Sequence, residues 1–209
     1  MAEKQGFVPE NYNPVEYWNA RNQPNTAKNP GISAAHAAYF ALHAKPGATI
    51  LELGPGIGRL FPMYRSAKDR TFSTVDIASQ HKDTVDAAAQ AQGLKVQQFF
   101  MNEADARYPF ADDSFDIGVS SYVFIHVPFE YIRHAMLEMA RVARKTIIFA
   151  TDNPLWAQSP ADRKPSSHCF NHDYAALCDA MGLTLFDSIR FPKAKDKDIT
   201  PTAFVFGKA

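Results

Sequence analysis

Three glycines occupy alternate positions directly after a short apolar segment. The segment TILEL at residues 49–53 is followed by Gly54, Gly56 and Gly58. Glycine adopts positive φ without steric penalty and lets a ligand come close to the backbone. Where such a turn leaves a buried strand of a parallel sheet, ligands lie beyond the carboxyl ends of the strands. The spacing therefore indicates a ligand site, and an ordinary strand-to-helix turn is the alternative.

The spacing of these glycines excludes the dinucleotide fingerprint, which is G-x-G-x-x-G. The third glycine would fall on Arg59 when counted from Gly54, and on Phe61 when counted from Gly56. The pattern present is E-x-G-x-G-x-G, beginning at Glu52. A neutral-to-acidic turn of this kind suits a cationic ligand better than a pyrophosphate.

Two further acidic positions follow the glycine turn along the chain. Asp76 ends the segment STVD, 18 positions after Gly58, where a carboxylate can accept hydrogen bonds from ribose hydroxyls. Capping of the next helix, a task that Ser79 could share, is the alternative for Asp76. The loop NEADARYPFADDSFD at 102–116 is the second position, and a solvated acidic loop is its alternative.

Together these three segments resemble the motifs of class I S-adenosylmethionine-dependent methyltransferases, from about Pro46 to the C-terminus. The resemblance implies that the turn wraps the methionine part of S-adenosylmethionine, with Glu52 near its amino group, often through water. It also implies that Asp76 binds the ribose and that Ile77 lies on the adenine face. The segment HCFNHDYAALCDAMGL at 168–183 is similar to a helix common in the family.

The third segment departs from the family pattern, because Asp105 and Ala106 lie one residue closer to Pro109 than is usual. Asp105 is the expected contact for the adenine amino group, with the backbone of Ala106 beside it. Glu103 is the alternative if the loop bulges.

The methyl acceptor is expected above the ends of the fourth and fifth strands. Residues predicted there are Ser120, Ser121, Tyr122 and His126 after the fourth strand, and Asp152, Asn153 and Trp156 after the fifth. Ser120 and Ser121 are assigned to the cofactor side, and Trp156 and His168 to the acceptor side. His126 is the candidate general base because histidine titrates near neutrality, and packing or water contact is its alternative role. We interpret TDNP at 151–154 as a turn.

Aromatic residues near the N-terminus could close the site. The helix expected at 14–21 carries Tyr17 and Trp18, which with Tyr12 and Arg21 could form a lid over the cofactor and substrate. Simple hydrophobic packing onto the core is the alternative. The predicted organisation is thus an N-terminal cap over residues 1–45 and a cofactor-binding core over residues 46–209.

No metal site is predicted. His168, Cys169 and His172 have suitable side chains, but their spacing matches no closed zinc set.

The remaining pattern predicts the elements that position these residues. Helices are expected at 34–44, 59–67, 79–92, 128–143 and 172–182, with Ser33 as a cap and Gly93 and Gly182 as terminators. Strands are expected at 49–53, 71–77, 95–100, 115–121, 145–151, 183–191 and 202–209. The alternation predicts a doubly wound α/β fold with a mostly parallel seven-stranded sheet, whose last two strands form an antiparallel hairpin.

Composition limits the partners. The 22 basic and 22 acidic residues cancel, and acidic residues interrupt the longest basic cluster, KAKDK at 193–197, so nucleic acid is not an expected partner. No apolar run approaches a membrane span, and MAEKQGFVPE lacks the apolar segment of a signal peptide, so we expect a cytoplasmic protein. The predicted reaction is methyl transfer to O or N of a small molecule. A methyltransferase acting on protein or nucleic acid, and a cofactor-binding regulator without chemistry, are the alternatives.

Overall fold

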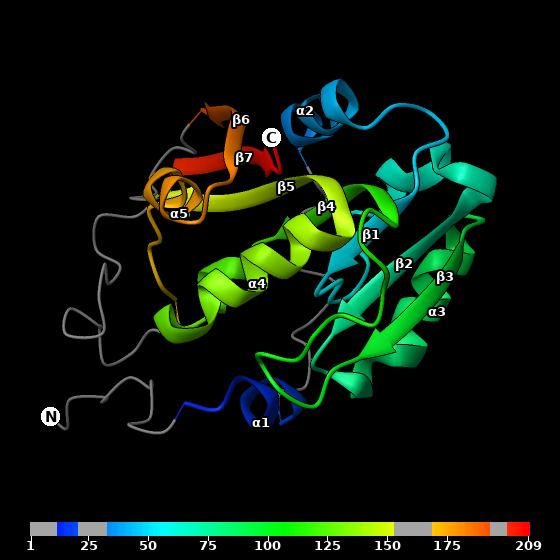
Figure 1. The fold of residues 1–209 in the computed structure, drawn as a ribbon. Helices are drawn as coiled ribbons and strands as arrows, with labels where there is room; N and C mark the ends of the chain where they lie inside the picture. The colour runs from blue at the N-terminus through cyan, green and yellow to red at the C-terminus, as the bar shows by residue number, and fades with distance from the viewer. Residues whose placement is uncertain (1–11, 21–32, 153–168, 193–199) are drawn as a thin grey trace, which may run out of the picture.

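The computed structural model describes residues 12–20, 33–152, 169–192 and 200–209. Over these residues the chain folds into a seven-stranded sheet flanked by helices (Figure 1). The strands are β1 (Ile50–Leu53), β2 (Thr71–Asp76), β3 (Lys95–Phe100), β4 (Phe115–Ser121), β5 (Ala143–Asp152), β6 (Thr184–Arg190) and β7 (Thr200–Gly207). The α-helices are α1 (Pro14–Asn19), α2 (Ala34–His43), α3 (Lys82–Ala91), α4 (Phe129–Val142) and α5 (Tyr174–Ala180).

The strand order is β3-β2-β1-β4-β5-β7-β6, which confirms the predicted doubly wound sheet. The first five strands are parallel, whereas β7 is antiparallel to both β5 and β6. The chain moves outward from β1 through β2 to β3 and then returns to place β4 on the other side of β1. This reversal opens a crevice beyond the carboxyl ends of β1 and β4, where ligands bind in open α/β sheets.

The sheet is buried on both faces because its inner strands alternate side chains between two hydrophobic cores. Ile147 and Phe149 belong to the core that includes residues of α2 and α3, whereas Ile148 and Ala150 belong to the core that includes residues of α4 and α5. Figure 1 shows α4 and α5 on the near face of the sheet. The continuous apolar sequence of β5 therefore follows from burial on both of its sides.

Local signals place the helix ends. Asn13 accepts hydrogen bonds from the backbone of Val15 and Glu16 at the start of α1, and Ser33 caps α2 as predicted. Gly93 and Gly182, both with positive φ, follow the ends of α3 and α5.

The predicted helix at 59–67 is wrong in type and extent. The chain forms a short 3₁₀ helix there, η2 (Phe61–Ser66), with Pro62 in its first turn. Proline has no N–H to donate, and the surrounding bonds are the i to i+3 type, such as Met63 N to Leu60 O at 2.8 Å. Three more 3₁₀ turns are η3 (Lys68–Arg70), η4 (Ser79–His81) and η5 (Phe124–His126).

None of the helices in the described ranges is long and apolar enough to cross a membrane.

Candidate cofactor and acceptor site

A pocket of about 260 Å³ lies at the carboxyl ends of β1, β2 and β4. Leu53 pairs in register with Val75 on one side and with Ser120 on the other, so these three strands end together. The loops that leave them supply most of the lining, and α1 supplies Pro14 and Trp18. The sheet therefore gathers residues that are widely separated in the sequence.

The glycine turn forms the floor of the pocket. Gly54, Gly56 and Gly58 all adopt positive φ, as expected for a turn that only glycine fits well. Gly54 and Gly56 line the pocket. Gly58 does not; a Cβ there would lie 2.5 Å from the ring of Phe61 and 2.8 Å from Ala88, so this glycine serves packing.

Glu52 is a buried carboxyl group on the pocket lining, with 1% of its surface exposed. Its Oε2 atom and the neighbouring Tyr64 hydroxyl are close to each other but do not meet the geometry of a hydrogen bond. Burial raises the pKa of Glu52 to about 8, and the nearby Tyr64 hydroxyl and Arg59 guanidinium oppose that rise. A buried, unsatisfied carboxyl group fits a cationic ligand, because a donor would recover the cost of its burial.

Asp76 ends β2 and also lines the pocket, with Ile77 next to it. Its Oδ1 atom accepts a hydrogen bond from the backbone N–H of Ala78 at 3.0 Å. Burial raises the pKa of Asp76 to about 6, and the backbone donors of Ala78 and Ile77 oppose that rise. The local bond shows that Asp76 also orders the turn that follows it.

Arg59 is a lining residue that the sequence reading did not assign. Its Nη2 atom donates to Ser121 Oγ at 2.6 Å, and its guanidinium lies 4.9 Å from the centroid of the Tyr122 ring. Tyr122 has φ of 59°, an uncommon backbone conformation for a tyrosine. The signal in the sequence was a basic residue immediately after the glycine turn, but its partners at the end of β4 are 62 and 63 positions away.

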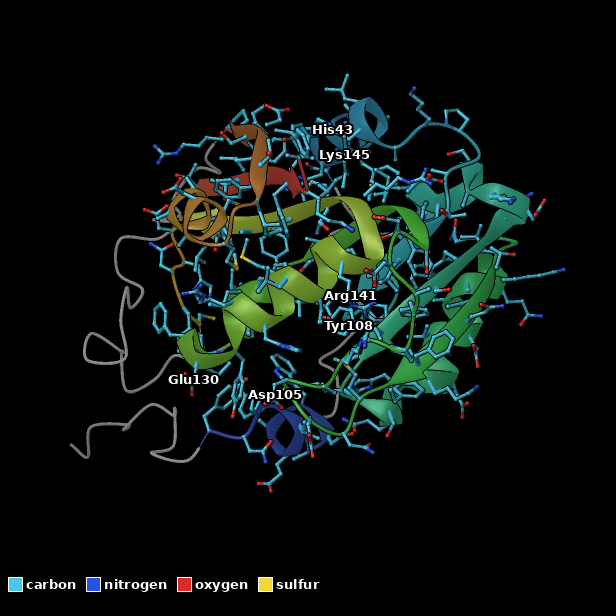
Figure 2. The ribbon with its side chains drawn as sticks, in the orientation of Figure 1. His43, Asp105, Tyr108, Glu130, Arg141 and Lys145 are labelled. Carbon is cyan, nitrogen blue, oxygen red and sulfur yellow. The ribbon has the colours of Figure 1, made fainter. Side chains whose placement is uncertain are left out.

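The acidic loop after β3 reaches the pocket through different residues from those predicted. Met101, Ala104 and Tyr108 line the pocket, whereas Asp105 is exposed and Ala106 is half-buried outside the lining. Figure 2 labels Asp105 and Tyr108 on this loop. Asp105 as the adenine contact therefore stays a prediction.

The loop is held by α4, which explains the position of Tyr108. Arg141 forms a bidentate pair with Glu138, with distances of 2.8 and 2.7 Å. Arg141 also donates to the carbonyls of Tyr108 and Phe110, and Glu138 accepts from the Tyr108 N–H at 2.8 Å. Figure 2 shows Arg141 and Tyr108 close to each other beside α4. We call Glu138 and Arg141 the α4 clasp.

The remaining predicted residues divide into three groups. Trp18, Ser121 and His126 line the pocket. Ser120 is fully buried outside the lining, and Tyr17 packs against Tyr12 and Trp18 with ring centroids 5.4 and 5.2 Å away. Asn153, Trp156 and His168 lie outside the described residues, as does Arg21.

The helix α1 is attached directly to this site. Asn19 Nδ2 donates to the carbonyl of Ile77 at 2.7 Å, and Gln80 Nε2 donates to the carbonyl of Trp18 at 2.7 Å. The Trp18 ring lies 5.0 Å from the ring of His126. The N-terminal aromatic residues thus reach the end of β2 and the turn after β4.

Comparison with known proteins agrees with this geometry. Residues 51–150 match the family model described as a methyltransferase domain. No curated protein sequence matches the chain. Similar solved structures include geranyl diphosphate methyltransferase in complex with S-adenosylmethionine (TM-score 0.62, 13% identity, 84% of this chain and 85% of that chain covered).

Two further similar structures show the range of the fold. Magnesium protoporphyrin IX methyltransferase from Synechocystis PCC 6803, with bound S-adenosylhomocysteine, has a TM-score of 0.60 at 15% identity, covering 84% of this chain and 80% of its own. The [4+2]-cyclase SpnF has a TM-score of 0.64 at 12% identity, and the match covers 94% of this chain and 90% of the SpnF chain.

The chain therefore has a Rossmann-like fold, and its residues 51–150 are similar to a methyltransferase domain. Two of these similar structures contain the methyl-donor cofactor S-adenosylmethionine or its product S-adenosylhomocysteine. The orphaned oxygen of Glu52, the position of Asp76 and the positive-φ glycines fit that cofactor.

Proposed function

We propose that the protein binds S-adenosylmethionine and transfers its methyl group to an O or N atom of a small molecule. The observation that carries this proposal is the position of α1, whose Pro14 and Trp18 form one wall of a pocket of about 260 Å³. A pocket bounded in this way suits a compact acceptor better than a polymer. The balance of 22 basic and 22 acidic residues also favours a small molecule over nucleic acid.

The cofactor end of the pocket contains complementary charged groups. Glu52 is suited to the amino group of the cofactor and Asp76 to the ribose hydroxyls, with Ile77 against the adenine. Arg59 is suited to the cofactor carboxylate, because a guanidinium binds a carboxylate through two parallel donors. Glu52 and Arg59 would then bind the two charges of the amino-acid end. Asp105 is retained as a candidate for the adenine amino group.

The acceptor end is formed by Trp18, Tyr122, Val123 and His126. S-adenosylmethionine supplies an activated methyl group, so positioning of the acceptor provides much of the acceleration. We assign His126 as the base that removes a proton from a hydroxyl or ammonium acceptor. The face of Trp18 orients the acceptor beside His126, and residues 1–45 act as a cap that excludes water.

A screen with an isotopically labelled methyl group on the cofactor tests this function. The purified protein is incubated with fractions of a metabolite extract, and each labelled product is identified by mass spectrometry. We expect a labelled small molecule whose formation falls at least tenfold in His126→Gln. His134→Gln is the matched control, because His134 lies on α4 and outside the pocket lining.

Other outcomes of the same screen would contradict the proposal. Label recovered only in protein or nucleic acid would favour the polymer-modifying alternative. Cofactor binding with no labelled product in any fraction would favour a regulator.

A further inference from the structure

Cys169 and His126 meet at the wall of the pocket. The Cys169 Sγ atom lies 3.5 Å from His126 Nδ1, within hydrogen-bond distance for sulfur. His126 ends η5, and Cys169 lies 43 residues further along the chain. The backbone N–H of Phe170 donates to the carbonyl of Ile125 at 2.7 Å, so the two segments are held together next to the pair.

The two cysteines of the chain have contrasting surroundings. Cys169 is half-buried, whereas Cys178 is 1% exposed and packs within the core under α5. Burial raises the pKa of Cys178 to about 11. Cys178 is therefore an internal control for a buried thiol that the reagent reaches poorly.

We propose that Cys169 and His126 form a thiol–imidazole pair in which Cys169 is a positioning residue for His126. An imidazole beside a thiol stabilises the thiolate and makes the sulfur more reactive. The same contact fixes the imidazole ring, because Nδ1 is directed at sulfur. Proton transfer with a substrate would then use Nε2, in the way that an oriented histidine acts in a catalytic triad.

The protons of this pair balance in each state. The Cys169 thiol loses its proton to water, and the resulting thiolate accepts a hydrogen bond from the Nδ1–H of a neutral imidazole, which leaves Nε2 unprotonated. When Nε2 takes a proton from the acceptor, the ring becomes an imidazolium beside the thiolate, and the acceptor lone pair forms the new bond to the methyl group. The proton leaves later from Nε2 to water. This catalytic part rests on the proposed function, whereas the existence of the pair does not.

Other titratable groups contact this wall. The Tyr12 hydroxyl donates to the carbonyl of His126 at 3.3 Å, and Tyr17 packs on Tyr12. His172 Nε2 lies 3.0 Å from the carbonyl of Val127. Burial lowers the pKa of His172 to about 4, so this ring is neutral near pH 7.

Alkylation with iodoacetamide tests the pair without any assay of activity. The thiolate sulfur forms a bond to carbon and iodide leaves, so the rate reports the thiolate fraction. We expect Cys169 to react at least tenfold faster than Cys178 at pH 7. The midpoint of the pH dependence of the Cys169 rate should lie below the pKa of ~8.5 of a free thiol. In His126→Gln the midpoint should rise and the rate at pH 7 should fall severalfold, while His134→Gln keeps the wild-type rate. Peptide mass spectrometry assigns each label.

Two results would overturn the pair: a wild-type Cys169 midpoint at or above ~8.5, or a Cys169 rate unchanged in His126→Gln. The pH midpoint of Cys169 alkylation in the wild-type protein tests the thiol–imidazole pair even if a variant folds poorly.

The positioning role is tested by Cys169→Ala and Cys169→Ser with the acceptor found in the screen. We expect the acidic limb of the pH–rate profile to shift and kcat to fall severalfold, with affinity for S-adenosylhomocysteine unchanged. An unchanged profile and kcat would overturn the positioning role. Absence of turnover in the wild-type protein would instead overturn the proposed function, since alkylation reports the pair separately.

Discussion

Two carboxyl groups at the ends of β1 and β2 are held in the pocket at a cost in stability. Burial raises the pKa of Glu52 to about 8 and that of Asp76 to about 6. Natural proteins retain such groups where a ligand needs them, because removing them commonly stabilises the fold and reduces function. Replacing either carboxyl group therefore compares its contribution to ligand binding with its cost in the free energy of unfolding.

Replacing Glu52 with Gln should change how stability depends on pH. The pKa of Glu52 is higher in the folded protein than the ordinary glutamate value of 4.5, so the folded state holds an extra proton between about pH 4.5 and 8. The free energy of unfolding must then fall as pH rises through that window, by on the order of 4 kcal/mol. We expect Glu52→Gln to match wild type at pH 5 and to be more stable at pH 8. Urea unfolding at both pH values measures this, and an identical pH slope in the two proteins would contradict it.

Arg59 should contribute to cofactor affinity through its charge and its fork geometry. We expect Arg59→Met to weaken binding of S-adenosylhomocysteine by at least tenfold, about 1.4 kcal/mol, and Arg59→Lys to lose less. Isothermal titration calorimetry measures both. Arg65→Met is the control, because Arg65 is exposed on η2 and bonds Gln92 instead. Equal affinities in the Arg59 and Arg65 variants would rule out a role for Arg59.

At the scale of elements, the site depends on two attachments that lie outside the glycine turn. The α4 clasp holds the loop that carries Tyr108, and Asn19 holds α1 to the end of β2. Each attachment joins residues that are distant in sequence. Both can be removed without replacing any residue assigned to the cofactor.

Breaking the α4 clasp should destabilise the protein. Arg141→Ala leaves the Glu138 carboxylate buried without its partner, which costs about 3 kcal/mol. Arg144→Ala is the matched control, since its pair with Asp116 is exposed and contributes at most about 1 kcal/mol. Urea unfolding compares the two variants. Similar losses in the free energy of unfolding of the two variants would show that the α4 clasp does not stabilise the loop.

Releasing α1 should weaken cofactor binding more than it weakens the fold. Asn19→Ala removes the bonds to the carbonyls of Ile77 and Val15, at a cost of about 1–2 kcal/mol. We expect faster amide exchange in α1 and severalfold weaker binding of S-adenosylhomocysteine. Gln90→Ala, on the exposed face of α3, should change neither quantity. An unaltered affinity of Asn19→Ala for S-adenosylhomocysteine would show that α1 takes no part in cofactor binding.

At the scale of the whole molecule, ligand binding should be visible as added stability. A ligand at ~100 times its dissociation constant stabilises by about 2.7 kcal/mol, which corresponds to a rise of roughly 5–10 °C for a chain of this size. We expect S-adenosylhomocysteine to produce this rise in a thermal-shift assay and NAD to produce none. A rise with NAD alone would contradict the assignment of the cofactor.

The sequence by itself determined the sheet, the glycine turn and the positions of Glu52 and Asp76 beside it. These features depend on local patterns, namely apolar periodicity, glycine spacing and the end of a strand, which can be read over a few residues. The helix predicted at 59–67 is instead a 3₁₀ helix over Phe61–Ser66.

Only the tertiary structure decided which loop residues reach the pocket. Arg59 meets Ser121 across 62 positions, Cys169 meets His126 across 43, and the α4 clasp places Tyr108 on the lining while Asp105 stays exposed. These contacts are set by the order of strands in the sheet and by long-range hydrogen bonds, and neither leaves a local pattern in the sequence.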